Sequence, residues 1–188
     1  MISQHFLLIP RLSDCTSNLR TGNIVTIRLN NITGIWERKI LSEQLEHKHT
    51  TAKKLFDAIN CAGEAGDLLS CNLRIQELRD LHRDYPQDAT IRERLVRGLA
   101  NIINFAGRVV NLKSYDSLLQ ELRDLYIAYP EELAIRESLA MGLFININWA
   151  EDAGNLQRCE PLLQEINDLH RAYPEDHLLK QTLELICQ

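Results

Sequence analysis

The sequence predicts an all-α protein built from stacked pairs of helices, and three observations support this prediction. Similar segments recur as LRDLHRDYPQDATIRERL at 78–95, LRDLYIAYPEELAIRESL at 122–139 and INDLHRAYPEDHLLKQTL at 166–183. The Tyr-Pro pairs begin at residues 85, 129 and 173, so each lies 44 residues after the one before. Apolar residues within each copy recur at helical spacing. A fixed period of about 20–50 residues is typical of a stacked repeat protein.

The repeat organises most of the chain. A shift of 44 residues keeps the copies in register from about residue 51 to residue 188 without a gap. We therefore expect a helical repeat domain at 41–188, with helix pairs at about 43–86, 87–130 and 131–174 and a capping helix at 175–188. Each amphipathic helix has one apolar stripe that it cannot bury alone, so neighbouring pairs have to stack.

The first helix of each pair is predicted from the Tyr-Pro corner onward. Pro130 suits the first helical position, where its missing N–H costs nothing. Glu131 and Glu132 would then lie in the first turn, at the positive end of the helix dipole. An apolar stripe follows at every fourth residue, and we expect the helix to end near Ala150. The stripe consists of Ile135, Leu139, Leu143 and Ile147.

The second helix is predicted at about 157–172, after the turn residues Asp152–Asn155. Its apolar residues cluster on one side, opposite Gln164 and Asp168. In the corresponding turn of the first pair, CAGEAGD, we expect Gly63 and Gly66 to adopt positive φ angles. At the corner, Tyr129 is expected to pack between consecutive pairs and to set their stacking angle.

Residues 1–40 are expected to lie outside the repeat, as a poorly ordered or hairpin-like extension. The segment TGNIVTIRLNNITGIW is rich in Ile, Val and Thr, which favours a strand or hairpin with a turn at Asn30-Asn31. A lone hairpin is marginal in water. It would therefore dock on the repeat or stay mobile, or the segment would be an accidental extension of the reading frame. Of these alternatives we expect poor order.

The sequence resembles tetratricopeptide-like helical repeats over about 43–188. The resemblance lies in the Leu-rich second helix, the YPED-type corner and the small residues in the inter-helix turn. The period differs, because tetratricopeptide units have about 34 residues and armadillo or HEAT units about 40–47. The Trp-Leu-Gly-Tyr signature of tetratricopeptide units is also missing, so the exact family stays open. The resemblance implies a right-handed αα superhelix, a solenoid, that acts as a protein-binding scaffold.

Composition narrows the function classes. A net charge of −5 argues against nucleic acid as a partner. No apolar run approaches the roughly 18 residues of a membrane span, and the N-terminal apolar patch lacks a preceding basic residue, so we expect no secretory signal. The five cysteines are odd in number and show no CxxC spacing. They predict reduced thiols in a cytoplasmic protein, with the repeat-equivalent Cys71 and Cys159 as small apolar fillers.

One basic residue per repeat forms a column: Lys48, Arg92, Arg136 and Lys180. These residues could line a groove and hold acidic groups of a peptide. The alternative is that each one pairs with the acid one turn earlier and covers the core with its stem. Asp88–Arg92, Glu132–Arg136 and Asp176–Lys180 have the favoured i,i+4 order. We favour this structural alternative.

A second column, Asn60, Asn104 and Asn148, lies away from the apolar stripe of the first helix. First helices line the concave side of two-helix solenoids, where an asparagine can donate to and accept from a peptide backbone. The alternative is that each Asn satisfies carbonyl groups at the end of its own helix. The predicted partner-binding residues on this face are Asn60, Asn104, Asn148, Arg97, Met141, Phe56, Phe144, Glu93 and Glu137.

The sequence thus predicts a non-enzymatic interaction scaffold that binds a protein or peptide partner on its concave face. No phosphate-binding loop, nucleophile elbow or HExxH motif occurs, and we expect neither a metal nor another cofactor. Two alternatives stay open. One is a structural module that stacks end to end through its final apolar helix; the other is a domain that uses the groove for a metabolite or for catalysis.

Overall fold

The structure is a computed structural model that describes residues 22–107 and 116–186, with side chains from residue 43 onward. All regular elements in these ranges are α-helices, and no strand occurs among them. The all-α prediction is therefore confirmed. By their internal contacts the residues form two compact units, Met1–Gln44 and Leu45–Gln188.

Helix α1, Gly22–Glu64, shows that the predicted hairpin is wrong. Residues 22–44 of the first unit are helical throughout, although Ile, Val and Thr are common there. β-propensity is a preference for a pleated, half-buried surface and not for a backbone conformation. Without partner strands, a helix satisfies every backbone group within the segment itself. The part of the predicted extension before residue 22 lies outside the described residues.

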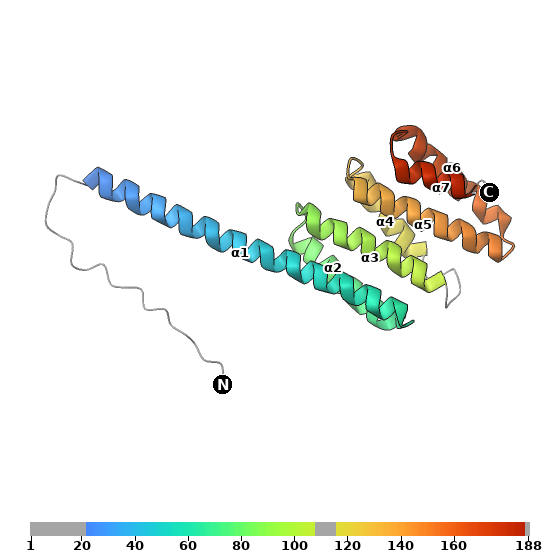
Figure 1. Ribbon diagram of the computed structural model, residues 1–188, viewed down its shortest axis with the longest axis horizontal. Helices are drawn as coiled ribbons and strands as arrows, with labels where there is room; N and C mark the ends of the chain where they lie inside the picture. The colour runs from blue at the N-terminus through green and yellow to red at the C-terminus, as the bar shows by residue number, and fades with distance from the viewer. Residues whose placement is uncertain (1–21, 108–115, 187–188) are drawn as a thin grey trace. The chain divides into compact units, whose positions relative to one another are not determined.

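The second unit contains the end of α1 and six further helices, and Figure 1 shows α3 and α5 side by side. Sequential helices pack on one another from α2 to α7, and α3 packs on α5 and α5 on α7 as well. Two sets of helices thus alternate along the chain: the first helices of the pairs (the end of α1, then α3, α5 and α7) and the second helices (α2, α4 and α6). The bounds are Leu68–Asp84 (α2), Ala89–Gly107 (α3), Asp116–Ala128 (α4), Leu133–Asp152 (α5), Leu156–Ala172 (α6) and His177–Ile186 (α7).

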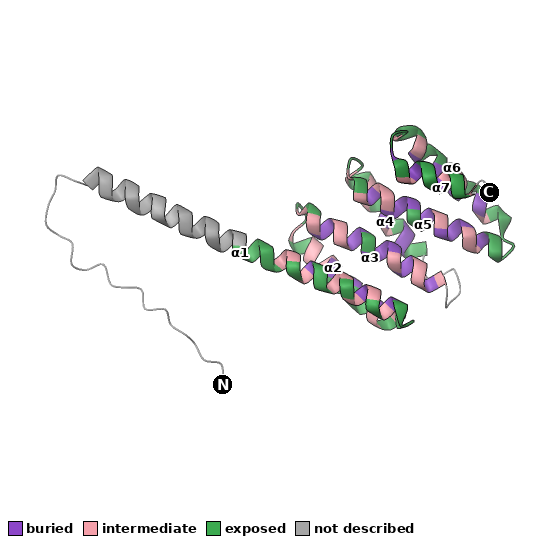
Figure 2. Ribbon diagram, in the orientation of Figure 1, coloured by how far each residue is buried: buried purple, intermediate pink, exposed green. Residues whose placement is uncertain are grey.

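The apolar stripes that the sequence predicted form the core. Ile135, Leu139, Leu143 and Ile147 on α5 are all buried, and Figure 2 shows buried residues recurring along α3 and α5. Glycines within these helices let the preceding unit approach closely. A Cβ on Gly98 would lie 3.0 Å from Ile75 Cδ1 and 3.2 Å from Ile59 Cδ1. The repeat-equivalent Gly142 faces Leu119, Leu122 and Ile103 in the same way.

The Tyr-Pro corner differs from the prediction. Helix α5 begins at Leu133 with Glu132 as its N-cap, so Pro130 lies in the turn and not at the first helical position. The Glu132 amide donates to Tyr129 O, which closes this turn. At the other corners an aspartate caps the helix: Asp88 accepts from the amides of Thr90 and Ile91, and Asp176 from those of Leu178 and Leu179. Proline suits a turn as well as a helix start, which explains the error.

The two glycines of the CAGEAGD turn have different roles. Gly66 has a φ of 74°, as expected for a turn glycine. Gly63 is helical, and the Cβ of any other residue there would lie 2.0 Å from Phe105 Cδ2. One repeat later, Gly107 faces the ring of Trp149 in the same way. An aromatic ring of α3 and one of α5 thus each pack against a glycine of the preceding first helix. The prediction of positive φ at Gly63 is wrong.

Candidate functional site

The basic column of the first helices stacks on the tyrosines of the corners. Lys48 Nζ lies 3.5 Å from the ring centroid of Tyr85, and the guanidinium carbon of Arg92 lies 3.7 Å from that of Tyr129. Arg136 stands 4.1 Å from the Tyr173 ring. Such stacking of cation on ring is favourable, more so when water is excluded. Arg92 is only 4% exposed, so its contact belongs to the interior, whereas Lys48 and Arg136 are half-buried.

The acids that pair with the column come from the following unit. Arg92 Nε donates to Glu132 at 3.0 Å, and Arg136 Nε lies 3.6 Å from Asp176. The hydrogen bond to Glu132 raises the pKa of Arg92, although burial opposes this. The predicted i,i+4 pairs of Arg92 and Arg136 are therefore wrong, while their structural role is confirmed. Stacking of units brings the next acid within reach, and periodicity within one helix cannot reveal this.

The corner tyrosines complete each junction. Tyr129 Oη donates to Pro86 O at 3.3 Å, and Arg92 donates to the same carbonyl at 2.6 Å. Tyr173 and Arg136 repeat the arrangement on Pro130 O, at 3.1 and 3.0 Å. Tyr129 is half-buried and packs against the core. The tyrosines therefore lie between consecutive pairs, as predicted, although their rings are not fully buried.

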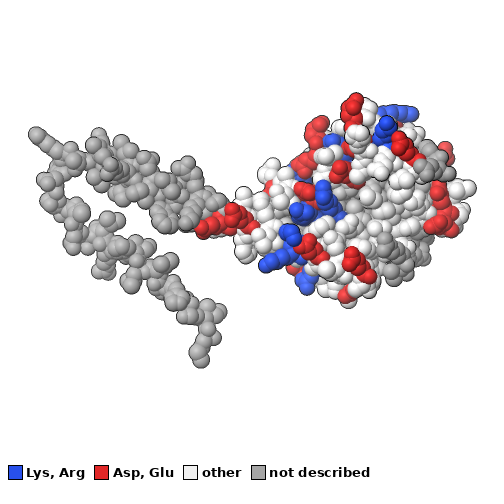
Figure 3. Space-filling view, viewed as in Figure 1, with Lys and Arg blue, Asp and Glu red and all other residues white. Residues whose placement is uncertain are grey.

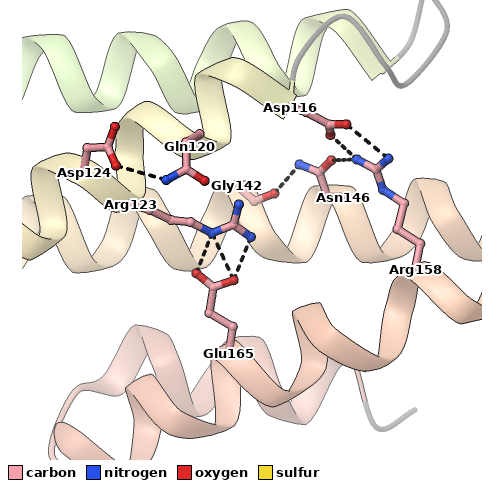
Figure 4. A network of polar contacts seen from close by, with 8 residues as sticks. All are labelled: Asp116, Gln120, Arg123, Asp124, Gly142, Asn146, Arg158 and Glu165. Atoms are coloured by element: carbon pink, nitrogen blue, oxygen red, sulfur yellow. Dashed lines mark hydrogen bonds and ion pairs between the residues drawn. The ribbon is translucent and has the colours of Figure 1, made fainter.

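Polar contacts also connect the second helices (Figure 4). Arg123 on α4 donates to both carboxylate oxygens of Glu165 on α6, at 2.7–3.1 Å. Arg79 on α2 holds Glu121 on α4 in the same way, one repeat earlier. Glu121 and Glu165 thus each form an ion pair with an arginine of the preceding unit. The neighbouring Gln120 bonds within its own helix, to Asp124.

A further network in Figure 4 is centred on Asn146. Asn146, 1% exposed within α5, donates to Gly142 O at 2.8 Å and accepts from Arg158 on α6 at 3.3 Å. Arg158 also forms an ion pair with Asp116 at the start of α4. Each buried polar group of this network has a hydrogen-bond or ion-pair partner, as is usual for polar groups in a protein interior. We therefore assign this network to the fold.

The candidate binding site is a hollow on the side of the second unit where α3, α5 and the end of α1 carry the predicted partner-binding residues. We call this side the first-helix face. The volume of the hollow is about 240 Å³. Met141 lies in it and is 41% exposed, whereas most apolar residues of α5 are buried. Four helices contribute to the lining: Phe56, Arg97, Ala100, Asn101, Glu137, Ser138, Met141 and Leu178.

Charges at this hollow are partly balanced. Arg97 Nε lies 3.3 Å from Glu93 on its own helix, and a terminal nitrogen lies 3.8 Å from Glu137 on α5. Figure 3 shows basic side chains over α3 and the adjoining part of α1, and mostly uncharged surface over α5. The hollow thus combines an aromatic ring, a thioether and an amide with an ion pair at its edge. Such a lining suits one large apolar side chain with polar groups around it.

The structure brings four of the nine predicted residues together in the hollow: Phe56, Arg97, Glu137 and Met141. Glu93 adjoins them through its ion pair with Arg97. The remaining four do not line it. Phe144 packs against the core, and Asn60 accepts a hydrogen bond from Asn101 at 2.7 Å. In the described part of the chain the half-buried side chains of Asn104 and Asn148 form no hydrogen bond, so no capping of their own helices is seen.

The residues of this region that sequence reasoning missed include Asn101, Arg94 and Leu178. Asn101 is replaced by Asp57 and Ile145 at the equivalent positions, so a search for repeated columns cannot find it. Arg94 stands over Phe56, with its guanidinium carbon 5.6 Å from the ring centroid. Leu178 comes from α7, which was predicted as a cap. These residues are recognised only when four helices are placed next to one another.

The described residues hold little reactive chemistry. No group of three or more His, Cys, Asp or Glu among them is placed to bind a metal ion. Cys71 and Cys159 are buried, as predicted, and their thiols lie 3.4 and 3.8 Å from Ile59 O and Ile147 O. Burial raises the pKa of both thiols, with a further contribution from Asp67 and Glu151 respectively. Such thiols are poor nucleophiles.

Comparisons of the chain with protein-family models, curated protein sequences and solved structures find no match. Within the described ranges, no helix combines the length and the apolar character needed to cross a bilayer.

Proposed function

We propose that the chain is a non-enzymatic interaction scaffold, a tetratricopeptide-like right-handed solenoid that binds a protein or peptide partner on its first-helix face. The observation that carries the proposal is the hollow, where Phe56, Arg97 and Met141 from three successive first helices meet. The repeated junctions at Tyr129 and Tyr173 support the solenoid, because each unit contacts the next by the same residues. The proposal retains a cytoplasmic location, in keeping with the free thiols of Cys61, Cys71 and Cys159.

The size of the hollow favours a protein partner over a metabolite. Small-molecule sites have volumes of roughly 300–1,000 Å³, and this hollow has about 240 Å³. One anchoring side chain of a partner fits such a volume better than a whole cofactor. Larger hollows of about 560 and 600 Å³ lie between α2 and α4. Arg79 lines both, and its ion pair with Glu121 would have to be disturbed by a charged ligand.

The described end of the array gives less support to end-to-end assembly. Leu179 on α7 is buried, and Leu183 and Ile186 pack partly against the core. The apolar side of α7 therefore faces its own unit, and Leu185 remains as its exposed leucine. A stacking interface needs a larger apolar surface than one side chain supplies.

Photo-crosslinking tests the proposal. We would place benzoylphenylalanine at Met141, in the hollow, and at Gln164, an exposed position on α6, and irradiate cells of the source organism. We expect a discrete set of crosslinked proteins at Met141 that is missing at Gln164. Changing Phe56 to Ala in the Met141 probe should weaken these crosslinks. The same products at both positions, or none at Met141, would contradict the proposal.

A further inference from the structure

Arg94 lies next to the hollow, and one nitrogen of its guanidinium has no hydrogen-bond partner. Its guanidinium carbon lies 5.6 Å from the centroid of the Phe56 ring, and Phe56 forms part of the hollow's wall. The Nε atom is buried and has no hydrogen-bond partner. Among the residues that the structure describes, none forms an ion pair with Arg94. A charged donor in this position is stabilised when a carboxylate approaches it.

Arg97 and Lys53 already have partners. Arg97 lies between Glu93 and Glu137, and Lys53 donates to Asp57 at 2.7 Å. Arg94 has no carboxylate partner among the described residues, so its guanidinium can pair with an incoming group. Its planar guanidinium can hold both oxygens of one carboxylate, a geometry that an ammonium group does not offer.

We propose that the partner is a peptide segment in which a large apolar residue lies close to an Asp or Glu. The apolar side chain enters the hollow between Phe56 and Met141, and the carboxylate binds Arg94. This inference rests on the proposed function and specifies the ligand of the same face. Arg94 selects the acid, and the exposed thioether of Met141 accommodates apolar residues of different shapes.

The geometry also restricts the spacing of the two residues. Arg94 and the Phe56 ring are 5.6 Å apart, and an extended chain advances roughly 3.3–3.6 Å per residue. An extended peptide therefore presents its acid about two positions from the apolar residue. In a helical peptide, residues about three or four positions apart are neighbours on one face. An acid farther away than four positions does not fit this arrangement.

A peptide-display experiment tests the inference. Random dodecapeptides on phage would be selected on the full chain, and the strongest binder synthesised with a fluorescent label. We expect selected sequences to contain an apolar residue with Asp or Glu two to four positions away. In fluorescence anisotropy, Arg94→Gln should raise the Kd about tenfold, as expected for loss of a charge-assisted pair. Arg83→Gln on α2 is the matched control and should leave the Kd unchanged.

A double-mutant cycle identifies the contact. Replacing the peptide's acid by its amide should weaken binding to the wild type, with little further loss in Arg94→Gln. Equal losses in both backgrounds, or selected peptides without an acid, would overturn the inference. If such acid-free peptides lose binding in Met141→Asp, the proposed function stands and only the ligand assignment fails. If no peptide is selected and Met141 gives no crosslinks, both fail. Circular dichroism confirms that each variant is folded.

Discussion

At the scale of single residues, glycines facing aromatic rings determine how closely the first helices pack. Gly63 faces Phe105, and Gly107 faces Trp149 one repeat later. Gly63 is buried, although it lies in the last turn of α1, where many side chains would be tolerated. Because Gly63 has no side chain, the Phe105 ring of the next unit can pack against it.

We expect Gly63→Ala to lower the free energy of unfolding by about 1–3 kcal/mol, the usual cost of overpacking. The added methyl would lie 2.0 Å from Phe105 Cδ2, so the ring has to move. Urea denaturation monitored by circular dichroism gives the value. The double variant Gly63→Ala/Phe105→Leu should lose less than the sum of the single variants. Strict additivity would show that the ring and the glycine are not coupled.

A second residue-scale prediction concerns His82 at the end of α2. Burial and the nearby Arg92 lower the pKa of His82, while Glu121 and Glu132 act in the opposite direction. Its Nδ1 atom is buried without a hydrogen-bond partner. Between the lowered pKa and the ordinary pKa of 6.5, the folded state therefore binds fewer protons than the unfolded state. The contribution of His82 to stability should be constant above about pH 7 and should fall as the pH drops from about 7 toward the lowered pKa.

We would measure the free energy of unfolding from about pH 7.5 to pH 5.5 in the wild type and in His82→Tyr. Tyrosine occupies the equivalent position, residue 126, and is half-buried there. We expect the variant to lose less stability over this interval than the wild type. Parallel pH profiles would mean that His82 does not contribute to the dependence.

At the scale of elements, the Tyr-Pro corner joins each pair to the next. Tyr129 contacts Arg92 through its ring and Pro86 O through its hydroxyl, so both partners belong to the preceding unit. Truncation of a buried aromatic residue costs roughly 3–5 kcal/mol. Because Tyr129 is half-buried, we expect Tyr129→Ala to cost about half of that. The unfolding transition should also become less cooperative, since one interface of a linear array is weakened.

Tyr173→Ala provides the comparison, because its contacts to Arg136 and Pro130 O are equivalent. Only α7 follows this corner in the described residues, so we expect a smaller loss than for Tyr129→Ala. Chemical denaturation of both variants decides the point. Small and equal losses would show that the corner tyrosines do not hold the pairs together.

The helices were predictable where periodicity is strong. The stripe of Ile135, Leu139, Leu143 and Ile147 indicated α5, and its residues are buried as expected. The part of α1 before about residue 43 was missed because Ile, Val and Thr between residues 22 and 36 resemble a strand locally. The start of α5 was misplaced by three residues, from Pro130 to Leu133, because proline suits both a turn and a first helical position.

At the scale of the whole molecule, the same contacts recur from one unit to the next. Arg79–Glu121 and Arg123–Glu165 connect the second helices, and Arg92–Glu132 and Arg136–Asp176 connect the first helices to the corners. The sequence alone predicted that units stack, but it assigned Arg92 to the acid within its own helix. The candidate site shows the same limit: Phe56 and Met141 were predicted, whereas Asn101 and Leu178 depend on the stacking.

Binding through the hollow of the first-helix face is the central claim, and one titration tests it most directly. The crosslinked partner, or the strongest peptide, would be titrated calorimetrically into the wild type, Met141→Asp and Ile127→Asp. Both residues are exposed and apolar, but Ile127 lies on the second helix α4. We expect Met141→Asp to weaken binding at least tenfold, because it places a charge where an apolar side chain binds, and Ile127→Asp to bind like the wild type. Equal affinity of all three proteins, or loss of binding in Ile127→Asp alone, would contradict it.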